Sequence, residues 1–355
     1  MKLLYFTLAI LLLRTGSIAQ KLDHISYGKY HIGFLSQYII DYSRPSLEAQ
    51  RLGRKITVNV WYPTPVNSKN KMSFFDYTVR ENVVAFKTEL SKGADTTGLN
   101  AFLKTKTYSQ LNAVLAEGKW PVVVLLHGSA FQYMLLGQYL ASHGMIAIGL
   151  PYQGFLQKDI DVNVIGMETQ IRDAEFAVGE IQKKYKLDIK NIGVLGYSFG
   201  GQSAVGYAVR NPLTKAMVSL DGGIGSDFGP YLLNNFPFFK IDQFQTPLLH
   251  LYNPHDIHGN IKWFEQTHFN DNYLIALDNM DHGYFGTHGW LDKLFPNKTK
   301  LKIGNNPEII LWATLQFFQN AFQGKEITSL ELKKNYTTTN ENIVSEEFKK
   351  KITGD

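Results

Sequence analysis

The sequence contains no cysteine, few charges and no apolar run long enough to cross a membrane easily. The lack of cysteine among 355 residues excludes disulfides, thiolate metal sites, a cysteine nucleophile and a lipid anchor on cysteine. The apolar run near the start, residues 3–13, is too short to span a bilayer comfortably. Charged residues make up 19%, with a net charge of +5 and no basic stripe, which argues against a nucleic-acid-binding protein.

The first nineteen residues have the pattern of a secretory signal peptide. Lys2 gives a positive start, the apolar run 3–13 follows, and Ser17 and Ala19 are small residues at the positions that signal peptidase reads. We expect a signal peptide over residues 1–19, cleavage near Ala19, and export to the periplasm or beyond. Arg14, close to the cleavage site, leaves an uncleaved membrane anchor as the alternative.

The remainder predicts one large domain, residues 20–324, and a polar tail, residues 325–355. With 44% hydrophobic residues the chain can bury a large core without disulfides. The tail holds six lysines and six acidic residues and is expected to form a solvated helix with a frayed end. In the first hundred residues the clearest strand is 54–63, where apolar side chains alternate strictly on one face: Ile56, Val58, Val60 and Tyr62.

A central sheet is predicted from residue 120 onward. The continuous apolar run Trp120–Leu126 is typical of a buried parallel strand. Further short apolar runs alternate with helical patterns, which predicts an α/β fold: a doubly wound, mostly parallel sheet with helices on both faces. The other expected strands are 145–150, 192–195, 216–220, 247–251 and 272–277, and the main helices are 132–143, 167–186 and 307–322.

Two segments interrupt this alternation. Residues 66–118 carry no strand signal; helices are expected around 73–90 and 107–116, and the segment either walls a pocket or is a peripheral excursion. Residues 223–245, rich in Phe and Gly, lie between two core strands and form either a cap over a site or a packed surface excursion.

The stretch Asn191–Gln202, NIGVLGYSFGGQ, organises the chain. A short apolar strand leads into Gly-Tyr-Ser-Phe-Gly, and a helical pattern follows. Strand, tight turn and helix are the context that a nucleophile elbow requires, with Ser198 as the nucleophile. Glycines two residues before and two after the serine, Gly196 and Gly200, let the strand and helix approach closely.

A serine nucleophile needs a base and an orienting carboxylate. Among the ten histidines, His282 is the predicted base because it follows the serine in a loop after a predicted strand; His288 is its nearest competitor. Asp221 and Asp256 each stand at the end of a predicted strand, and both qualify as the acid. Sequence physics alone does not separate these two carboxylates.

Two backbone N–H groups should stabilise the developing oxyanion. Phe199, directly after the nucleophile, is the first expected donor. Ser129, in the loop after strand 120–126, is the second, since Gly128 frees the backbone to turn inward. No metal or other cofactor is predicted: the dense run of His255, Asp256 and His258 is interpreted as a polar loop.

These motifs together resemble the α/β-hydrolase superfamily. The shared pieces are HGS at 127–129, GYSFGG at 196–201, LDGG at 220–223 and DHGYF at 281–285. The branch most similar to them is that of the secreted platelet-activating-factor acetylhydrolase-like and dienelactone-hydrolase-like esterases, which also share the ITVNVWYP strand at 56–63. The resemblance covers roughly residues 50–320.

The resemblance implies an exported serine hydrolase that cleaves carboxylic esters, short-chain or phospholipid-like, through an acyl-enzyme. In the acetylhydrolase-like members the acid follows the strand after the elbow helix, which favours Asp221; the commoner position matches Asp256. Dienelactone hydrolases carry a cysteine nucleophile, so Ser198 favours ordinary esters over dienelactone. Expected partners are a small-molecule or lipid ester and transiently a membrane surface, with no nucleic acid. The alternatives are an exported peptidase or amidase of this fold, and a non-catalytic binding protein on a hydrolase scaffold.

Overall fold

The computed structural model describes residues 25–44, 53–78, 96–154, 160–256, 259–267, 270–294, 302–325 and 343–349. The predicted signal peptide, residues 1–19, lies outside these described ranges. Within them, no helix combines the length and the apolar character that crossing a bilayer would need.

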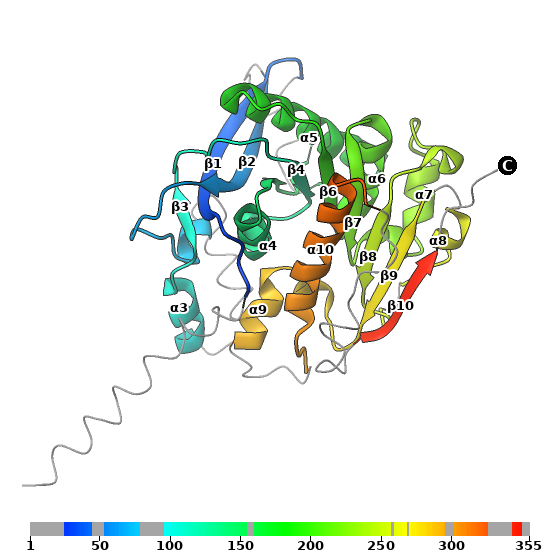
Figure 1. The fold of residues 1–355 in the computed structure, drawn as a ribbon. Helices are drawn as coiled ribbons and strands as arrows, with labels where there is room; N and C mark the ends of the chain where they lie inside the picture. Colours follow the sequence, from blue (N-terminus) through cyan, green and yellow to red (C-terminus); the bar gives the residue numbers. More distant parts are fainter. Residues whose placement is uncertain are drawn as a thin grey trace, which may run out of the picture.

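The described strands form a single ten-stranded sheet (Figure 1). Its spatial order is β10-β9-β8-β7-β6-β4-β5-β2-β1-β3. The stretch from β5 through β4 to β9 is parallel throughout, so its carboxyl ends share one edge. The strands are β1 His31–Asp41, β2 Arg54–Thr64, β3 Ser109–Leu111, β4 Val122–Leu126, β5 Ile146–Leu150, β6 Ile192–Tyr197, β7 Thr214–Leu220, β8 Leu248–Tyr252, β9 Asn272–Leu277 and β10 Ile343–Lys349.

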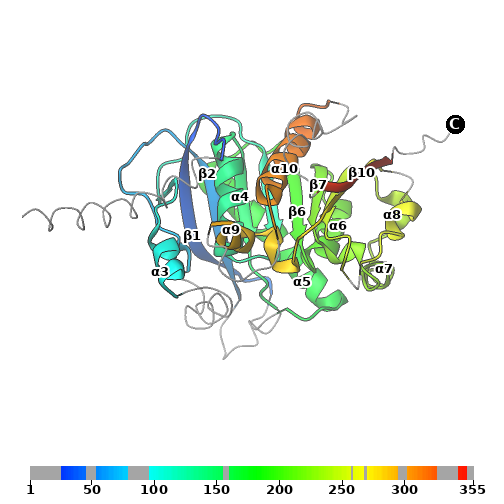
Figure 2. The same cartoon turned by 90° about the horizontal axis from the view of Figure 1, so that it is seen from below.

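Helices cover both faces of the sheet, as the alternation predicted (Figure 2). Residues of α4 Ala130–Ser142 and α10 Asn306–Phe322 join the core on one face, close to α9 Thr287–Leu294. Residues of α5 Val164–Tyr185 and α6 Gly200–Arg210 join the core on the other face. The predicted α/β fold is confirmed, and the expected strands and main helices lie within a few residues of their predicted bounds.

The alternation of side chains along β2 places them on two faces, as predicted. The four apolar residues on one face of β2 join the core beneath α5 and α6, whereas Trp61 on the opposite face joins the core beneath α4. Val60 and Trp61 are both fully buried. β2 is therefore sandwiched between the two helical layers, and it pairs antiparallel with β1 and β5.

The insertion 66–118 differs from its prediction. The helix expected over 107–116 is absent; β3 pairs there in parallel with β1 at the edge of the sheet. Over the first expected helix the structure describes only a short 3₁₀ turn, η2 Phe75–Thr78, and α3 Thr96–Lys104 follows; residues 79–95 lie outside the described ranges. Burial of Ser109 and Gln110 and pairing with β1 prevail over the local pattern, because tertiary pairing routinely overrides weak propensity.

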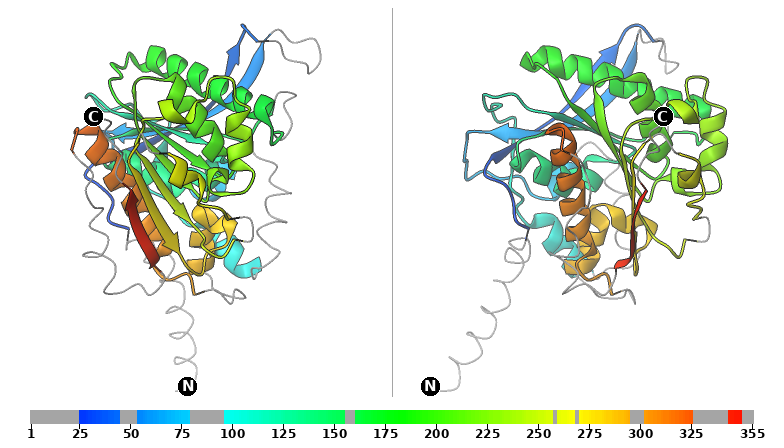
Figure 3. Two further views of the ribbon diagram at one scale, coloured as in Figure 1. Left: turned by 90° about the vertical axis from the view of Figure 1, so that its right-hand side faces the viewer. Right: turned by 45° about the vertical axis from the view of Figure 1, so that its right-hand side comes forward.

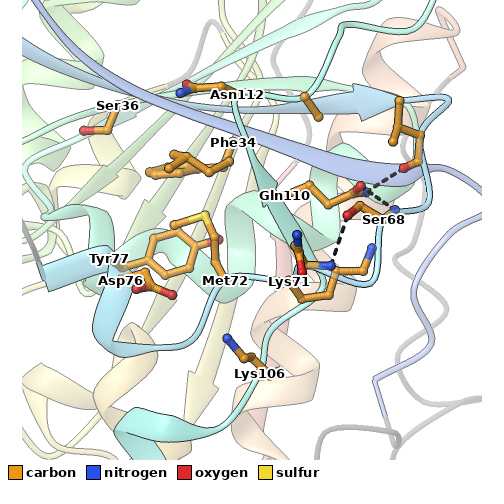
Figure 4. A pocket seen from close by; sticks show the side chains of 14 residues that line it. Phe34, Ser36, Ser68, Lys71, Met72, Asp76, Tyr77, Lys106, Gln110 and Asn112 are labelled. Atoms are coloured by element: carbon orange, nitrogen blue, oxygen red, sulfur yellow. Dashed lines mark hydrogen bonds between the residues drawn. The ribbon is translucent and has the colours of Figure 1, made fainter.

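The insertion also walls a groove of about 790 Å³ beside β1 and β3 (Figure 4). Phe34, Met72 and Tyr77 line it together with Lys71 and Lys106. The side chain of Gln110 ties the wall together, accepting from the Ser68 N–H (2.7 Å) and donating to the Val66 carbonyl (2.6 Å). In the sheet order this groove is separated from β6 by β2, β5 and β4.

The segment 223–245 forms two 3₁₀ turns, η3 Gly223–Gly225 and η4 Ile241–Gln243, around the short helix α7 Gly229–Asn234. Most of its large apolar side chains are buried and join the core beside α5 and α6. The segment is therefore mainly packed structure, and only its first residues reach the carboxyl edge of the sheet. The buried members are Ile224, Leu232, Leu233, Phe236, Phe239 and Phe244.

The expected helix in the polar tail is wrong for residues 343–349. These residues form β10, which pairs antiparallel with β9 and closes that edge of the sheet (Figure 3, red). The physical reason is that an edge strand presents unpaired N–H and C=O groups, which a returning segment can satisfy. Composition alone indicated only a solvated segment, because the polar residues of an edge strand also remain in water.

Candidate active site

Ser198 stands on the turn between β6 and α6, at the carboxyl edge of the parallel sheet. Its φ of +54° lies in the left-handed region, which is costly for a residue with a Cβ. Backbone bonds hold it there: the Ser198 N–H donates to Leu220 O (3.2 Å), and its carbonyl accepts from Gly201 N (2.9 Å) and Gly223 N (2.8 Å). This strained backbone, held in place by several hydrogen bonds, is the geometry that the elbow motif predicts.

The two glycines of the motif are required by close backbone approach. A Cβ on Gly196 would lie 2.0 Å from Gly200 O, and one on Gly200 would lie 2.6 Å from Leu126 O. Neither backbone atom can move aside without breaking the sheet or the helix start. The spacing of glycine around Ser198 therefore follows from sterics, as predicted.

A continuous hydrogen-bonded chain joins three residues that lie far apart in sequence. The Nε2 atom of His282 lies 2.9 Å from Ser198 Oγ, and its Nδ1 atom lies 2.6 Å from Asp221 Oδ2. Asp221 follows β7, and His282 opens the 3₁₀ turn η5 His282–Phe285 after β9. One nitrogen of the imidazole thus faces the serine hydroxyl while the other faces a carboxylate, the arrangement of a serine nucleophile with its base and acid.

Asp221 is held more firmly than a turn-capping aspartate. Its side chain is only 7% exposed, and its φ is +42°. Its N–H donates to Leu251 O (2.7 Å), while its Oδ1 accepts from Asn253 N (3.0 Å) and leaves Oδ2 to His282. The backbone of β7 and β8 therefore aims this carboxylate at the imidazole.

Asp256, the other candidate acid, lies in the loop after β8. It lines the same small cavity as Ser198 and His282, but the Nδ1 atom of His282 bonds to Asp221. Asp256 acts on the imidazole through its charge. The two carboxylates left open by the sequence therefore occupy different positions around one histidine.

Tyr197, the residue before the nucleophile, supports His282 in two ways. Its ring stacks on the imidazole, with centroids 4.9 Å apart and planes 25° apart. Its hydroxyl donates to the His282 carbonyl oxygen (3.1 Å). The sequence pattern gave no signal for this contact, because it joins the last residue of β6 to the turn η5, far along the chain.

Partial burial lowers the pKa of His282, but the hydrogen bond and charge of Asp221, followed by the charges of Asp256 and Asp281, outweigh it. The pKa of His282 is therefore raised above its ordinary value. An imidazole that gains a proton readily in this position is suited to accept the proton of the Ser198 hydroxyl.

The competing histidines lie elsewhere. His288 belongs to α9, where its ring packs edge-on against Phe131 (5.6 Å between centroids). His255 lies 3.1 Å from Asp278, and His258 lies outside the described residues. In the part of the chain that the structure describes, no group of three His, Asp or Glu side chains is arranged to hold a metal ion.

The two expected oxyanion donors stand at helix starts beside the elbow. Phe199 immediately precedes α6, and Ser129 is the N-cap of α4, its hydroxyl accepting from Gln132 N (3.1 Å). The loop of Ser129 contacts the elbow, since a Cβ on Gly200 would lie 2.7 Å from His127 Cβ. Helix N-termini present N–H groups and a positive dipole end to an anion.

Two imidazoles near the site, His127 partly buried and His250 buried, have no role in the sequence prediction. Burial, aided by the nearby His282, lowers the pKa of His127 to about 4, and burial lowers that of His250 to about 4. His250 Nδ1 lies 3.0 Å from Ser219 Oγ, and its ring stacks on Tyr252 (5.2 Å). Both imidazoles are neutral at neutral pH, so they add no positive charge to the site.

A cavity of about 170 Å³ opens beside the Ser198–His282 pair. It lies under the first residues of the 223–245 segment and against the loop that follows β8. The described residues that line it are Ser198, Asp221, Gly222, Gly223, Gly225, Ser226, His250, Tyr252, Asn253, Asp256, Gly259 and His282.

Comparison with known proteins gives a family match over part of the chain and a similar fold. The dienelactone hydrolase family matches residues 111–272, a span that contains Ser129, Ser198, Asp221 and Asp256 but ends before His282. No curated protein sequence matches the chain. The solved structure of a ferulic acid esterase from Streptomyces cinnamoneus is similar in fold, with a TM-score of 0.58 and 18% identity, covering 85% of this chain and 93% of the esterase.

These matches confirm the resemblance to the dienelactone-hydrolase-like esterases and the α/β-hydrolase fold. They support a hydrolase of the esterase type. Because 667 solved chains match this fold, likeness in shape does not by itself select a reaction.

Proposed function

We propose that this dienelactone-hydrolase-like protein is a serine hydrolase that cleaves carboxylic esters through an acyl-enzyme. The observation that carries the proposal is the chain from Ser198 Oγ to His282 Nε2 (2.9 Å) and from His282 Nδ1 to Asp221 Oδ2 (2.6 Å), with the serine on a strained elbow. A lone serine hydroxyl is a weak nucleophile at neutral pH. The hydrogen bonds from Ser198 to His282 and from His282 to Asp221 are what activate it.

In the first step Ser198 Oγ attacks the ester carbonyl carbon while His282 Nε2 takes the hydroxyl proton. Asp221 holds the Nδ1–H and stabilises the imidazolium that forms. The tetrahedral intermediate then collapses, and His282 returns the proton to the departing alcohol oxygen. Water, activated by the same imidazole, attacks the acyl-enzyme and releases the carboxylic acid, which restores Ser198.

The negative charge on the carbonyl oxygen is assigned to the backbone N–H groups of Phe199 and Ser129. Their positions at the starts of α6 and α4 support this assignment. The N–H of Gly128, the residue before Ser129, donates to Leu150 O instead (3.4 Å). Loss of one such donor typically costs about 3 kcal/mol of transition-state stabilisation.

Small esters are the proposed substrates, short-chain or phospholipid-like. The cavity beside the triad, about 170 Å³, equals the volume of roughly six waters at ~30 Å³ each, which suits one small substituent of the substrate. Phe228 and Tyr231, 61% and 68% exposed, follow the cavity-lining residues in sequence and support a transient contact with lipid surfaces.

The position of Asp221 directly after β7 supports the acetylhydrolase-like pattern. The pattern of residues 1–19 supports export, which N-terminal sequencing of the mature protein would test.

The test is hydrolysis of p-nitrophenyl acetate and butyrate by the mature protein and three variants. Ser198→Ala should lower kcat by up to ~10⁶-fold and Asp221→Asn by ~10⁴-fold. His288→Gln is the matched control and should leave kcat within about threefold. A fluorophosphonate probe should label the wild type and not Ser198→Ala.

Each contrary result has one meaning. An active wild type with an equally active Ser198→Ala variant would remove the elbow from the mechanism. Cleavage of p-nitroanilides in preference to the esters would identify an amidase of the same fold. A wild type that hydrolyses nothing and resists the probe would favour the binding protein.

A further inference from the structure

The groove beside β1 and β3, about 790 Å³ in volume, lies apart from the proposed active site. None of its described lining residues lines the cavity beside Ser198 and His282. In the sheet order β2, β5 and β4 separate it from β6. Its volume falls within the range of about 300–1,000 Å³ that small-molecule sites occupy. The groove is therefore a candidate binding site that the proposed reaction does not use.

The floor of the groove is apolar and preformed. Phe34, Met72 and Tyr77 are 2%, 5% and 2% exposed, and the rings of Phe34 and Tyr77 pack with their centroids 4.7 Å apart. All three side chains belong to the core beneath α4, where close packing holds them in place. Gln110 fixes the wall through its two side-chain hydrogen bonds. A bound molecule would therefore meet a surface whose shape the core already determines.

The rim of the groove adds exposed apolar surface and two cationic groups. Val66 and Leu111 are 41% and 59% exposed and both line the groove. Lys71 and Lys106 line it as well. Figure 4 shows Phe34 at one side of the groove and Lys106 at the opposite side. Apolar and cationic groups thus face the same space.

The two lysines form no ion pair with any described residue. Lys71 Nζ makes only a long bond of 3.4 Å to Asn67 Oδ1, and partial burial lowers its pKa from the ordinary value. Asp76 is the one carboxylate among the described lining residues. Its Oδ2 accepts from the N–H (2.5 Å) and the hydroxyl (2.8 Å) of Ser73. Lys71 and Lys106 against Asp76 leave the lining with one net positive charge.

We propose that this groove binds an amphipathic monoanion, a molecule with an apolar body and one anionic head, such as a medium-chain carboxylate. Lys71 and Lys106 attract the head, while Val66, Leu111 and the apolar floor receive the body. The single negative charge matches the single net positive charge of the lining. The inference goes beyond the proposed esterase function and does not depend on it.

The experiment uses two fluorescent probes that differ in one group. 1-Anilinonaphthalene-8-sulfonate carries one negative charge, and N-phenyl-1-naphthylamine is the same molecule without the sulfonate. A lysine ammonium is a point charge without the fixed fork of arginine, so a sulfonate can represent the head. Lys71→Met/Lys106→Met should weaken binding of the sulfonate about tenfold, and should change binding of the neutral probe less than about twofold.

The matched control is Lys69→Met/Lys104→Met. It removes two exposed lysines that stand two residues before each tested one and do not line the groove, and it should change neither affinity more than about twofold. Leu111→Ser, at an exposed position, should weaken both probes. Sulfonate binding that ignores Lys71 and Lys106, or that falls equally in the control, would overturn the inference. Equal weakening of the neutral probe by the Lys71 and Lys106 changes would do the same.

Displacement of the sulfonate probe tests the class of ligand. Octanoate should displace it, whereas octylammonium, which has the same chain length and the opposite charge, should not. Failure of octanoate, or equal displacement by octylammonium, would contradict the proposed site. Ser198→Ala should bind the probe like the wild type, since binding needs no turnover. Groove binding without any ester hydrolysis would overturn the esterase alone, and ester hydrolysis without charge-dependent groove binding would overturn this site alone.

Discussion

Replacement of Arg54 tests how a buried ion pair holds the loop after β5 to the rest of the fold. Arg54, at the start of β2, is 1% exposed and makes a two-pronged bond to Asp173 of α5, Nε to Oδ1 at 2.7 Å and Nη2 to Oδ2 at 2.6 Å. Its Nη2 and Nη1 also donate to the carbonyls of Gln153 and Gly154, both at 2.8 Å. One side chain thus joins the strand, the helix and the loop after β5.

Arg54→Met should destabilise the protein by about 3–4 kcal/mol. Removal of one partner of a buried ion pair commonly costs 3–5 kcal/mol because the other charge stays buried, and two loop carbonyls also lose their donor. The lower half of the range applies because Arg44 remains 2.8 Å from Asp173. Urea denaturation followed by tryptophan fluorescence would measure the change from the midpoint and slope.

The control is Arg172→Met, on α5, the helix that also carries Asp173. Arg172 is 54% exposed and pairs with Glu168 four residues away, so its loss should cost less than about 1 kcal/mol. The double variant Arg54→Met/Asp173→Leu removes both buried charges and should recover much of the lost stability. A single-variant cost below about 1 kcal/mol, or a double variant worse than the sum of the singles, would refute the reasoning.

Three further predictions concern the site. The acid limb of kcat/KM should lie above pH 6.5, because the pKa of His282 is raised and the neutral imidazole is the base; Asp256→Asn should move that limb to lower pH in a pH–rate profile. Burial lowers the pKa of His250 to about 4, so its stability contribution is full above pH 6.5 and is lost as pH falls toward 4; His250→Gln should flatten that part of a denaturation series, and an unchanged slope would exclude His250. Tyr197→Leu, which removes the ring stacked on His282, should lower kcat about tenfold with little change in KM, whereas Tyr197→Phe should lose less; equal losses would assign the effect to the hydroxyl.

Local patterns were informative wherever one chemical requirement acts over a few residues. The strict alternation in β2 predicted which side chains enter the core, since successive strand residues point to opposite faces. The glycines around Ser198 predicted the elbow, because only glycine tolerates the 2.0 Å and 2.6 Å approaches found there. The insertion and the tail were read less well: β3 and β10 form because open strand edges next to them need partners, and no local pattern records that need.

The chain order and residue types by themselves determined the fold class, the serine and the set of groups that could surround it. Only the tertiary structure decided between Asp221 and Asp256 as the carboxylate bonded to His282. Both follow a parallel strand at the same edge of the sheet, so sequence position treats them alike. The difference comes from backbone bonds between β7 and β8, which aim the Asp221 side chain at Nδ1. Such bonds depend on where neighbouring strands end in space, which a pattern along the chain does not encode.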